Sequence, residues 1–180
     1  MLSRGILSLA LVILVAGSLQ AQEAPKPGPE HQKLHEMVGD WDTVMDVGGQ
    51  KSKGKVTYKS ICGGFWVASD FEADLFGTKF EGHGVDGYDV TKKKYVGLWV
   101  DSMITTPLTL EGDFDTKANQ LVMTGTGPGP DGKPQKFRST TEFKTKDLVI
   151  FKMYETPADG VEKLGFTIEY TRKKKPSTGN

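Results

Sequence analysis

Trp99 and Asp101 are the residues whose types and spacing most directly suggest chemistry. On a β-strand they share one face with Tyr95 and Gly97, because successive side chains alternate between faces. If that face lies inside a barrel, it forms an aromatic wall with one carboxylate, which can orient a ligand in a mostly apolar pocket. If it lies outside, the apolar side chains of the other face fill the core instead, namely Val96, Leu98 and Val100. The sequence leaves both alternatives open.

His83 is the second residue of interest, because it lies between Gly82 and Gly84 on a predicted strand. The missing side chains leave room there for a ligand or for a neighbouring backbone. The alternative is a histidine that is hydrogen-bonded on a tightly packed strand. The predicted lining of a binding site is therefore Trp99, Asp101, Tyr88, His83 and Phe71.

The histidines near the beginning of the predicted domain do not indicate a metal site. His31 and His35 are four residues apart and could share a helix face, as paired metal ligands do. The segment lacks the Glu of a catalytic zinc helix, and no third ligand follows from the sequence. We therefore predict no metal and no cofactor. Cys62 is the only cysteine, cannot form an intramolecular disulfide, and is expected to be a small buried side chain.

A glycine-rich segment, Gly125 to Gly132, has the composition of a phosphate-binding loop but not its pattern. It has no Gly-Lys-Ser/Thr ending, and Pro128 and Pro130 remove N–H donors. We interpret it as a long hairpin loop with an Asp-Gly turn.

The first 21 residues have the pattern of a secretory signal peptide. Arg4 supplies a positive charge, Ile6 to Ala16 form an apolar stretch, and Ala21 is a small residue at a plausible cleavage point. We expect export to the periplasm or the extracellular space. No later apolar run reaches the length of a membrane span, so no stable membrane insertion is expected after cleavage.

Composition excludes some functions. The 180 residues are 37% hydrophobic and 26% charged, typical of one globular domain. Lys plus Arg equals Asp plus Glu at 23 each, so no net field attracts nucleic acid, and a nucleic-acid partner is not expected. The domains we predict are the signal peptide (1–21), a Pro-rich linker (22–29), a barrel domain (30–173) and a C-terminal tail (174–180).

One short helix and about nine or ten strands are predicted. The helix spans Glu30 to Val38. From Asp40 onward, apolar residues recur with period two between clusters of Gly, Asp, Asn and Lys. The strands run approximately over Trp41–Val47, Gly54–Cys62, Phe65–Leu75, Thr78–Tyr88, Tyr95–Ser102, Leu108–Phe114, Gln120–Thr126, Gln135–Phe143, Leu148–Glu155 and Leu164–Thr171.

Many strands joined by hairpins leave two exposed sheet edges unless the sheet closes. An all-β fold, an antiparallel up-and-down barrel, solves this problem. In the last strand we expect Leu164, Phe166, Ile168 and Tyr170 to face inside together. Two similar segments, beginning at Tyr88 and Phe114, read as hairpin turns whose Asp and Thr side chains bond the turn backbone. Trp41 and Trp66 are expected in the core or at the barrel end.

Gly39-Asp40-Trp41, after a short helix, resembles the Gly-x-Trp start of lipocalin-like (calycin-type) barrels, in which the Trp plugs one end. The chain as a whole, from about Glu30 to Arg172, resembles the uncharacterised bacterial family catalogued as domain of unknown function 1579. The segments that carry this likeness are His35, Gly39 and Trp41, Gly84-Val85-Asp86-Gly87-Tyr88-Asp89, Lys94-Tyr95-Val96 and Trp99-Val100-Asp101-Ser102-Met103. The resemblance implies a lipocalin-like barrel and supplies no catalytic residues. A more distant likeness is to haem-binding nitrobindins, but these use a late histidine, and the last histidine here is His83.

Three functions remain open at this stage. The first is a binding module whose lumen holds one small apolar or amphipathic molecule. The second is a barrel enzyme in which His83 or Asp101 is the general base. The third is a structural or interaction protein with a filled core. The catalytic residues and the oligomeric state are unknown from the sequence, and an enzyme is the less favoured alternative, because the chain has no recognised catalytic constellation.

Overall fold

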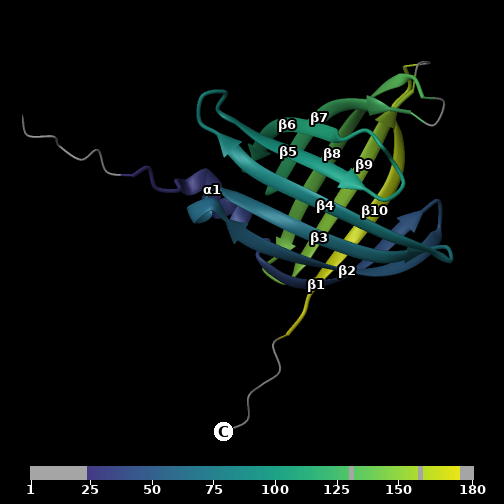
Figure 1. The fold of residues 1–180 in the computed structure, drawn as a ribbon, viewed down its shortest axis with the longest axis horizontal. Coiled ribbons are helices and arrows are strands. Elements are labelled where there is room, and N and C mark those ends of the chain that lie inside the picture. Colours follow the sequence, from purple (N-terminus) through teal and green to yellow (C-terminus); the bar gives the residue numbers. More distant parts are fainter. Residues whose placement is uncertain (1–23, 130–131, 158–159, 175–180) are drawn as a thin grey trace, which may run out of the picture.

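The computed structural model describes residues 24–129, 132–157 and 160–174. The predicted signal peptide therefore lies outside the described residues. One short helix and ten antiparallel strands form a closed barrel (Figure 1). The elements are α1 (Pro29–His35), β1 (Gly39–Val47), β2 (Gln50–Ile61), β3 (Trp66–Leu75), β4 (Thr78–Asp89), β5 (Lys94–Asp101), β6 (Leu108–Asp115), β7 (Gln120–Pro128), β8 (Pro134–Thr145), β9 (Leu148–Thr156) and β10 (Lys163–Arg172).

Each strand pairs with the next one in the chain, and β1 pairs with β10 to close the barrel. The predicted fold class is confirmed, and every predicted strand has its counterpart. Closure leaves no unpaired sheet edge, which explains how a chain with so many hairpins remains protected from edge pairing. A one-turn 3-10 helix, Cys62–Gly64, connects β2 to β3.

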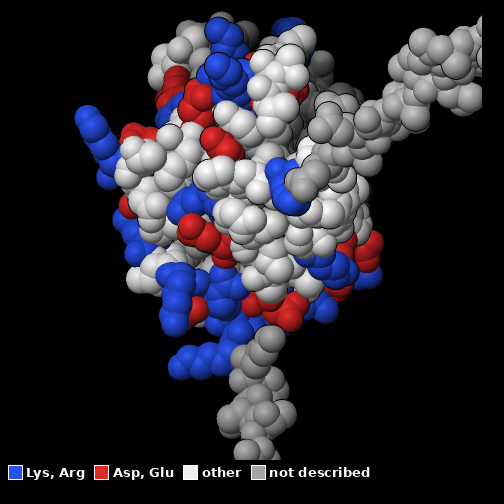
Figure 2. Space-filling model, turned by 90° about the vertical axis from the view of Figure 1, so that its left-hand side faces the viewer, with Lys and Arg blue, Asp and Glu red and all other residues white. Residues whose placement is uncertain are grey.

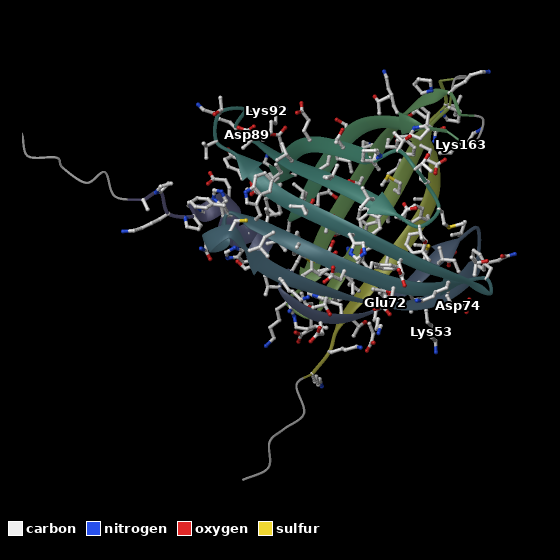
Figure 3. The ribbon with its side chains drawn as sticks, in the orientation of Figure 1. Lys53, Glu72, Asp74, Asp89, Lys92 and Lys163 are labelled. Atoms are coloured by element: carbon white, nitrogen blue, oxygen red, sulfur yellow. The ribbon has the colours of Figure 1, made fainter. Side chains whose placement is uncertain are left out.

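Alternation within each strand separates the barrel interior from its surface. In β6, Leu108, Leu110, Gly112 and Phe114 point inward and are partly buried, whereas the residues between them are exposed. Figure 3 shows the same rule on the outer face, where Glu72 and Asp74 of β3 point away from the barrel near Lys53 of β2. The inner face thus collects the apolar side chains, because burial removes them from water.

Two similar turns, each beginning at an Asp residue, connect β4 to β5 and β6 to β7. Asp89, labelled with Lys92 in Figure 3, accepts the backbone N–H groups of Thr91 and Lys92 at 2.9 and 3.0 Å. Asp115 accepts those of Lys117 and Ala118 at 2.9 and 3.1 Å. The predicted hydrogen bonds from Asp side chains to the turn backbone are thus confirmed.

The end of the barrel under α1 is closed by Trp41 and Arg172. Trp41 is completely buried, and its indole N–H donates to the Met37 carbonyl at 2.7 Å. The Arg172 guanidinium stacks on the Trp41 ring, 4.0 Å from its centroid, and donates to the carbonyls of Val38, Glu36 and Lys146. Arg172 therefore joins the helix to the last strand. Figure 2 views this end and shows acidic and basic side chains interspersed.

At the opposite end of the barrel, the described residues form no helix, and the hairpins carry exposed apolar side chains. These are Val47 at the end of β1, Phe76 between β3 and β4, Met103 and Ile104 between β5 and β6, and Val161 and Leu164 at the β9–β10 hairpin. An open groove of about 580 Å³ lies near this end on the outer side of the β1–β10 seam, and both apolar and charged residues line it, among them Val44, Asp46, Leu164 and Glu169. We call this end the open end.

Three sequence predictions are wrong in detail. Cys62 is exposed rather than buried, because it occupies a turn with a positive φ of 50°. Trp66 is 36% exposed and packs over the outer surface of Gly87, so it belongs neither to the core nor to the end plug. Leu164 is 53% exposed, because a register shift between Leu164 and Phe166 turns it out of the inward series.

The glycine-rich segment has a different extent from the predicted loop, because residues 125–128 belong to β7. The remaining turn holds Gly129, whose N–H donates to the Lys133 carbonyl at 2.7 Å. Residue 131 of the predicted Asp-Gly turn lies outside the described residues. Within the described ranges, no helix is long and apolar enough to cross a membrane.

Candidate functional site

The β5 face that carries Trp99 and Asp101 points into the barrel. Leu98 and Val100, on the other face, are each 42% exposed on the outer surface. The structure thus resolves the two alternatives of the sequence in favour of the aromatic inner wall. Trp99 and Asp101 keep part of their surface accessible, as do Leu110 of β6 and Phe166 of β10 toward the open end. The inner wall is therefore not completely covered at that end.

Trp99 lies flat against two glycines of β4. A Cβ atom at Gly82 would lie 2.2 Å from the indole ring, and one at Gly84 would lie 3.3 Å from it. The indole N–H donates to the Asp101 carboxylate at 2.9 Å, and the ring meets Phe71 edge-on at 6.3 Å. Because these two glycines have no side chains, β4 leaves room for the large indole ring to face inward.

The carboxylate of Asp101 is already engaged by its own loop. It accepts the backbone N–H groups of Met103 and Ile104 at 2.8 and 3.0 Å, in addition to the Trp99 indole. Asp101 therefore fixes the inner wall to the β5–β6 loop at the open end. A general base would have to give up these hydrogen bonds, so this geometry does not favour Asp101 in that role.

The predicted lining residues are only partly brought together. Phe71 is buried and contacts Trp99, but Tyr88 lies below α1, where it packs edge-on against Tyr95 and His31. His83 is on the outer surface, and its Nδ1 contacts the Asp70 carboxylate at 3.0 Å. The prediction that His83 lines the interior is wrong, because residues 82, 84, 86 and 88 take the inner face of β4 and leave 83 outside. His83 cannot act as a base on a molecule inside the barrel.

His31 and His35 serve the helix rather than a metal ion. His31 is buried and accepts the Gly28 N–H at 3.0 Å, while His35 Nε2 donates to the Gly64 carbonyl at 2.9 Å. Over residues 24–129, 132–157 and 160–174, no three His, Cys, Asp or Glu side chains gather as a metal site would require. These contacts hold α1 against the β2–β3 connection.

Asp86 is an interior carboxylate that the sequence analysis missed. It faces inward from β4, opposite Gly97 of β5, and its Oδ1 would lie 2.5 Å from a Cβ at that glycine. Burial raises the pKa of Asp86 from 3.8 to about 7. Nevertheless the residue keeps part of its surface accessible. Asp86 is therefore a desolvated carboxylate residue that its neighbours do not cover completely.

Two tyrosines accompany Asp86. Tyr58 of β2 and Tyr170 of β10 lie next to each other, with their ring centroids 6.4 Å apart. Burial raises the pKa of both phenols, and the negative charge of Asp86 raises it further. We call Asp86, Tyr58 and Tyr170 the polar cluster. The Thr43 hydroxyl, on β1 opposite Tyr170, is buried without a hydrogen-bond partner in the described part of the chain.

The polar cluster has no positive partner in the described residues. Burial is the sole resolved cause of the Asp86 shift, so no cation lies near enough to lower its pKa. Two basic groups at the α1 end form contacts with other residues. Lys33 lies over the Phe114 and Phe143 rings and pairs with Glu36, and Arg172 stacks on Trp41. The interior thus combines an aromatic wall with one uncompensated carboxylate.

A pairing signal in the sequence could have identified Asp86. The β4–β5 hairpin pairs Asp89 with Lys94, and counting back from that turn places Asp86 opposite Gly97. A carboxylate on the same face as Phe80 and two glycines, with a third glycine across from it, has room to lie inside. Tyr58 and Tyr170 come from strands distant in sequence, and only barrel closure brings them together.

Comparisons with known proteins identify a sequence family and similar barrel structures. The sequence model of a family described as "Protein of unknown function (DUF1579)" matches residues 26–172. The S-type phycobiliprotein lyase CPES from Guillardia theta has a similar structure, with a TM-score of 0.53, 12% identity, and coverage of 83% of this chain and 100% of that chain. A de novo designed fluorescence-activating β-barrel aligns with a TM-score of 0.44, 15% identity, and coverage of 77% of this chain and 95% of that chain. No curated protein matches significantly. At these identities the lyase shows the fold alone.

Proposed function

The chain belongs to the DUF1579 family of proteins of unknown function, and we propose that it binds one small apolar or amphipathic molecule inside its barrel. The observation that carries this proposal is the accessible inner wall at the open end, where Trp99 and Asp101 face inward beside Phe71. Apolar walls with a few placed polar groups are typical of small-molecule sites.

The open end supplies the path for the ligand. Exposed apolar residues on the hairpins there, such as Phe76, Met103 and Leu164, would meet an apolar molecule before it enters. The α1 end is closed by Trp41 and Arg172, so binding and release would both use the open end.

We further propose that the protein acts after export, which rests on the pattern of residues 1–21. N-terminal sequencing of the protein recovered from the exported fraction of its source cells would test this. The expected mature N-terminus is Gln22. An intact N-terminal Met1 on protein found only inside the cell would contradict export without bearing on ligand binding.

Two matched substitutions test where the molecule binds. Leu110→Trp enlarges an inward side chain of β6, whereas Leu98→Trp makes the same change on the outer face of the neighbouring strand. Decanol, titrated by calorimetry into each folded variant, is the probe. We expect Leu110→Trp to weaken decanol binding by about tenfold or more, and Leu98→Trp to leave it unchanged. Equal binding of decanol by both variants would overturn the proposal, as would a failure of the unmodified protein to bind decanol and also its amine and carboxylate counterparts.

A further inference from the structure

We infer that the ligand carries a protonated amine, and that the Asp86 carboxylate inside the barrel is the group that binds it. This inference rests on the proposed function, because it names the chemistry of the molecule that the barrel would hold. It concerns a different part of the interior from Trp99 and Asp101, which form the wall at the open end.

Among the residues that the structure describes, no group near Asp86 neutralises an ionised carboxylate. Asp86 pairs across the sheet with Val67 of β3 on one side and Gly97 of β5 on the other. Met123 of β7 lies next to Gly97, with its methyl group 3.4 Å from the position of a Cβ there. None of these three residues can carry a charge or donate a side-chain hydrogen bond.

The titratable groups that face Asp86 from the other strands are two phenols. Tyr58 comes from β2 and Tyr170 from β10, and the charge of Asp86 raises the pKa of each. Phenols of raised pKa remain neutral around neutral pH, so they contribute dipoles and no countercharge. The one strongly ionisable group of the cluster is therefore the carboxylate.

An isolated carboxylate in an apolar interior is costly unless a cation or several donors meet it. An alkylammonium ion supplies both the positive charge and N–H donors, and its alkyl chain suits the aromatic wall between Asp86 and the open end. A fatty carboxylate would place like charges together, which disfavours it. A neutral alcohol would gain the apolar contacts but not the ion pair.

The same geometry predicts a pH dependence. Asp86 is protonated in a growing fraction of molecules below pH 7, since its pKa is about 7. An alkylamine remains protonated across this range, as a lysine side chain does. Binding of the amine should therefore strengthen from about pH 6 to about pH 8, whereas binding of the alcohol should not change.

Decylamine, decanol and decanoate form a matched series for the test, because they share one alkyl chain and differ in the headgroup. Each is titrated by calorimetry, below its micelle concentration, into the full mature chain and into Asp86→Asn. Asp113→Asn is the control, because Asp113 is exposed on the outer face of β6, where it pairs with Lys94. Circular dichroism and thermal melting establish that each variant is folded.

We expect decylamine to bind the unmodified chain about tenfold more tightly than decanol at about pH 8, and decanoate to bind most weakly. Asp86→Asn should remove the preference for the amine while decanol still binds, and Asp113→Asn should retain the preference. An amine preference that survives in folded Asp86→Asn, or equal binding of amine and alcohol by the unmodified chain, would overturn the inference and leave the proposed function standing. Failure of all three probes to bind would overturn both.

Discussion

The carboxylate of Asp86 occupies the space that a side chain at residue 97 would need. The two residues are paired across β4 and β5, and a Cβ at Gly97 would lie 2.5 Å from Asp86 Oδ1. No real Cβ makes so short a contact, so the glycine is what gives the interior carboxylate its position. The arrangement of the polar cluster therefore depends on Gly97, a residue without a functional group.

Gly97→Ala should displace the Asp86 carboxylate, because Met123 limits movement on the other side of the new methyl group. We expect a loss of stability of about 1–3 kcal/mol, typical of overpacking, and a weaker preference for decylamine over decanol. Urea unfolding and calorimetry measure the two effects. Gly165→Ala is the control, since a Cβ there would meet only the end of the flexible Glu155 side chain. Unchanged stability and unchanged amine preference in Gly97→Ala would contradict this description of the pair.

Asp86 should make the barrel less stable as the pH rises. Its pKa is about 7 in the folded chain and 3.8 when unperturbed, so between these values the folded state binds more protons than the unfolded state. Stability from this group is then complete below about pH 4 and decreases as the pH rises to about 7, by up to about 4 kcal/mol. Asp86→Asn should remove this decrease.

Urea unfolding of the unmodified chain and of Asp86→Asn, at a series of pH values, measures the effect directly. The Asn variant should be the more stable of the two at about pH 8, and the difference should shrink toward about pH 4. A difference that is independent of pH would mean that Asp86 is not desolvated in the folded chain.

The number and order of the strands could be predicted from the sequence, because alternation and turn residues are local signals. The orientation of β5 could not, since Leu98 and Val100 are more apolar than the Trp99 face and yet lie outside. The neighbouring strand β4 determines which face of β5 points inward, because Gly82 and Gly84 leave room for the Trp99 indole to pack against its backbone. Whether the indole can pack there depends on which residues of the two strands are paired. The alternation of side chains within one strand does not give that pairing.

His83 and Asp86 illustrate the same difference within β4. Both His83 and Tyr88 were predicted to lie inside, although an unbroken strand cannot turn an odd-numbered and an even-numbered residue to one face. Strict application of alternation would have excluded His83 and drawn attention to Asp86, which shares the face of Tyr88. The phenols of Tyr58 and Tyr170 could not be foreseen, because they meet Asp86 only in the closed barrel.

Arg172 should contribute strongly to stability through the α1 end. Arg172→Ala removes the guanidinium from the Trp41 ring and leaves the Val38 carbonyl, among others, without its donor. We expect a loss of about 2–4 kcal/mol in the free energy of unfolding, measured in urea. Lys173→Ala is the matched control, because its exposed ion pair with Asp42 should contribute little. Equal effects of the two substitutions would contradict the role of Arg172 in fixing the helix to the barrel.

Native mass spectrometry of the protein purified from its own exported fraction tests the central claim most directly. The proposed function predicts a mass in excess of the polypeptide, corresponding to one small molecule per chain, which is lost on denaturation and identified in the extract. Where the barrel is purified empty, added decylamine should restore a one-to-one complex. A spectrum that shows the polypeptide alone, both as purified and after this addition, would contradict ligand binding inside the barrel.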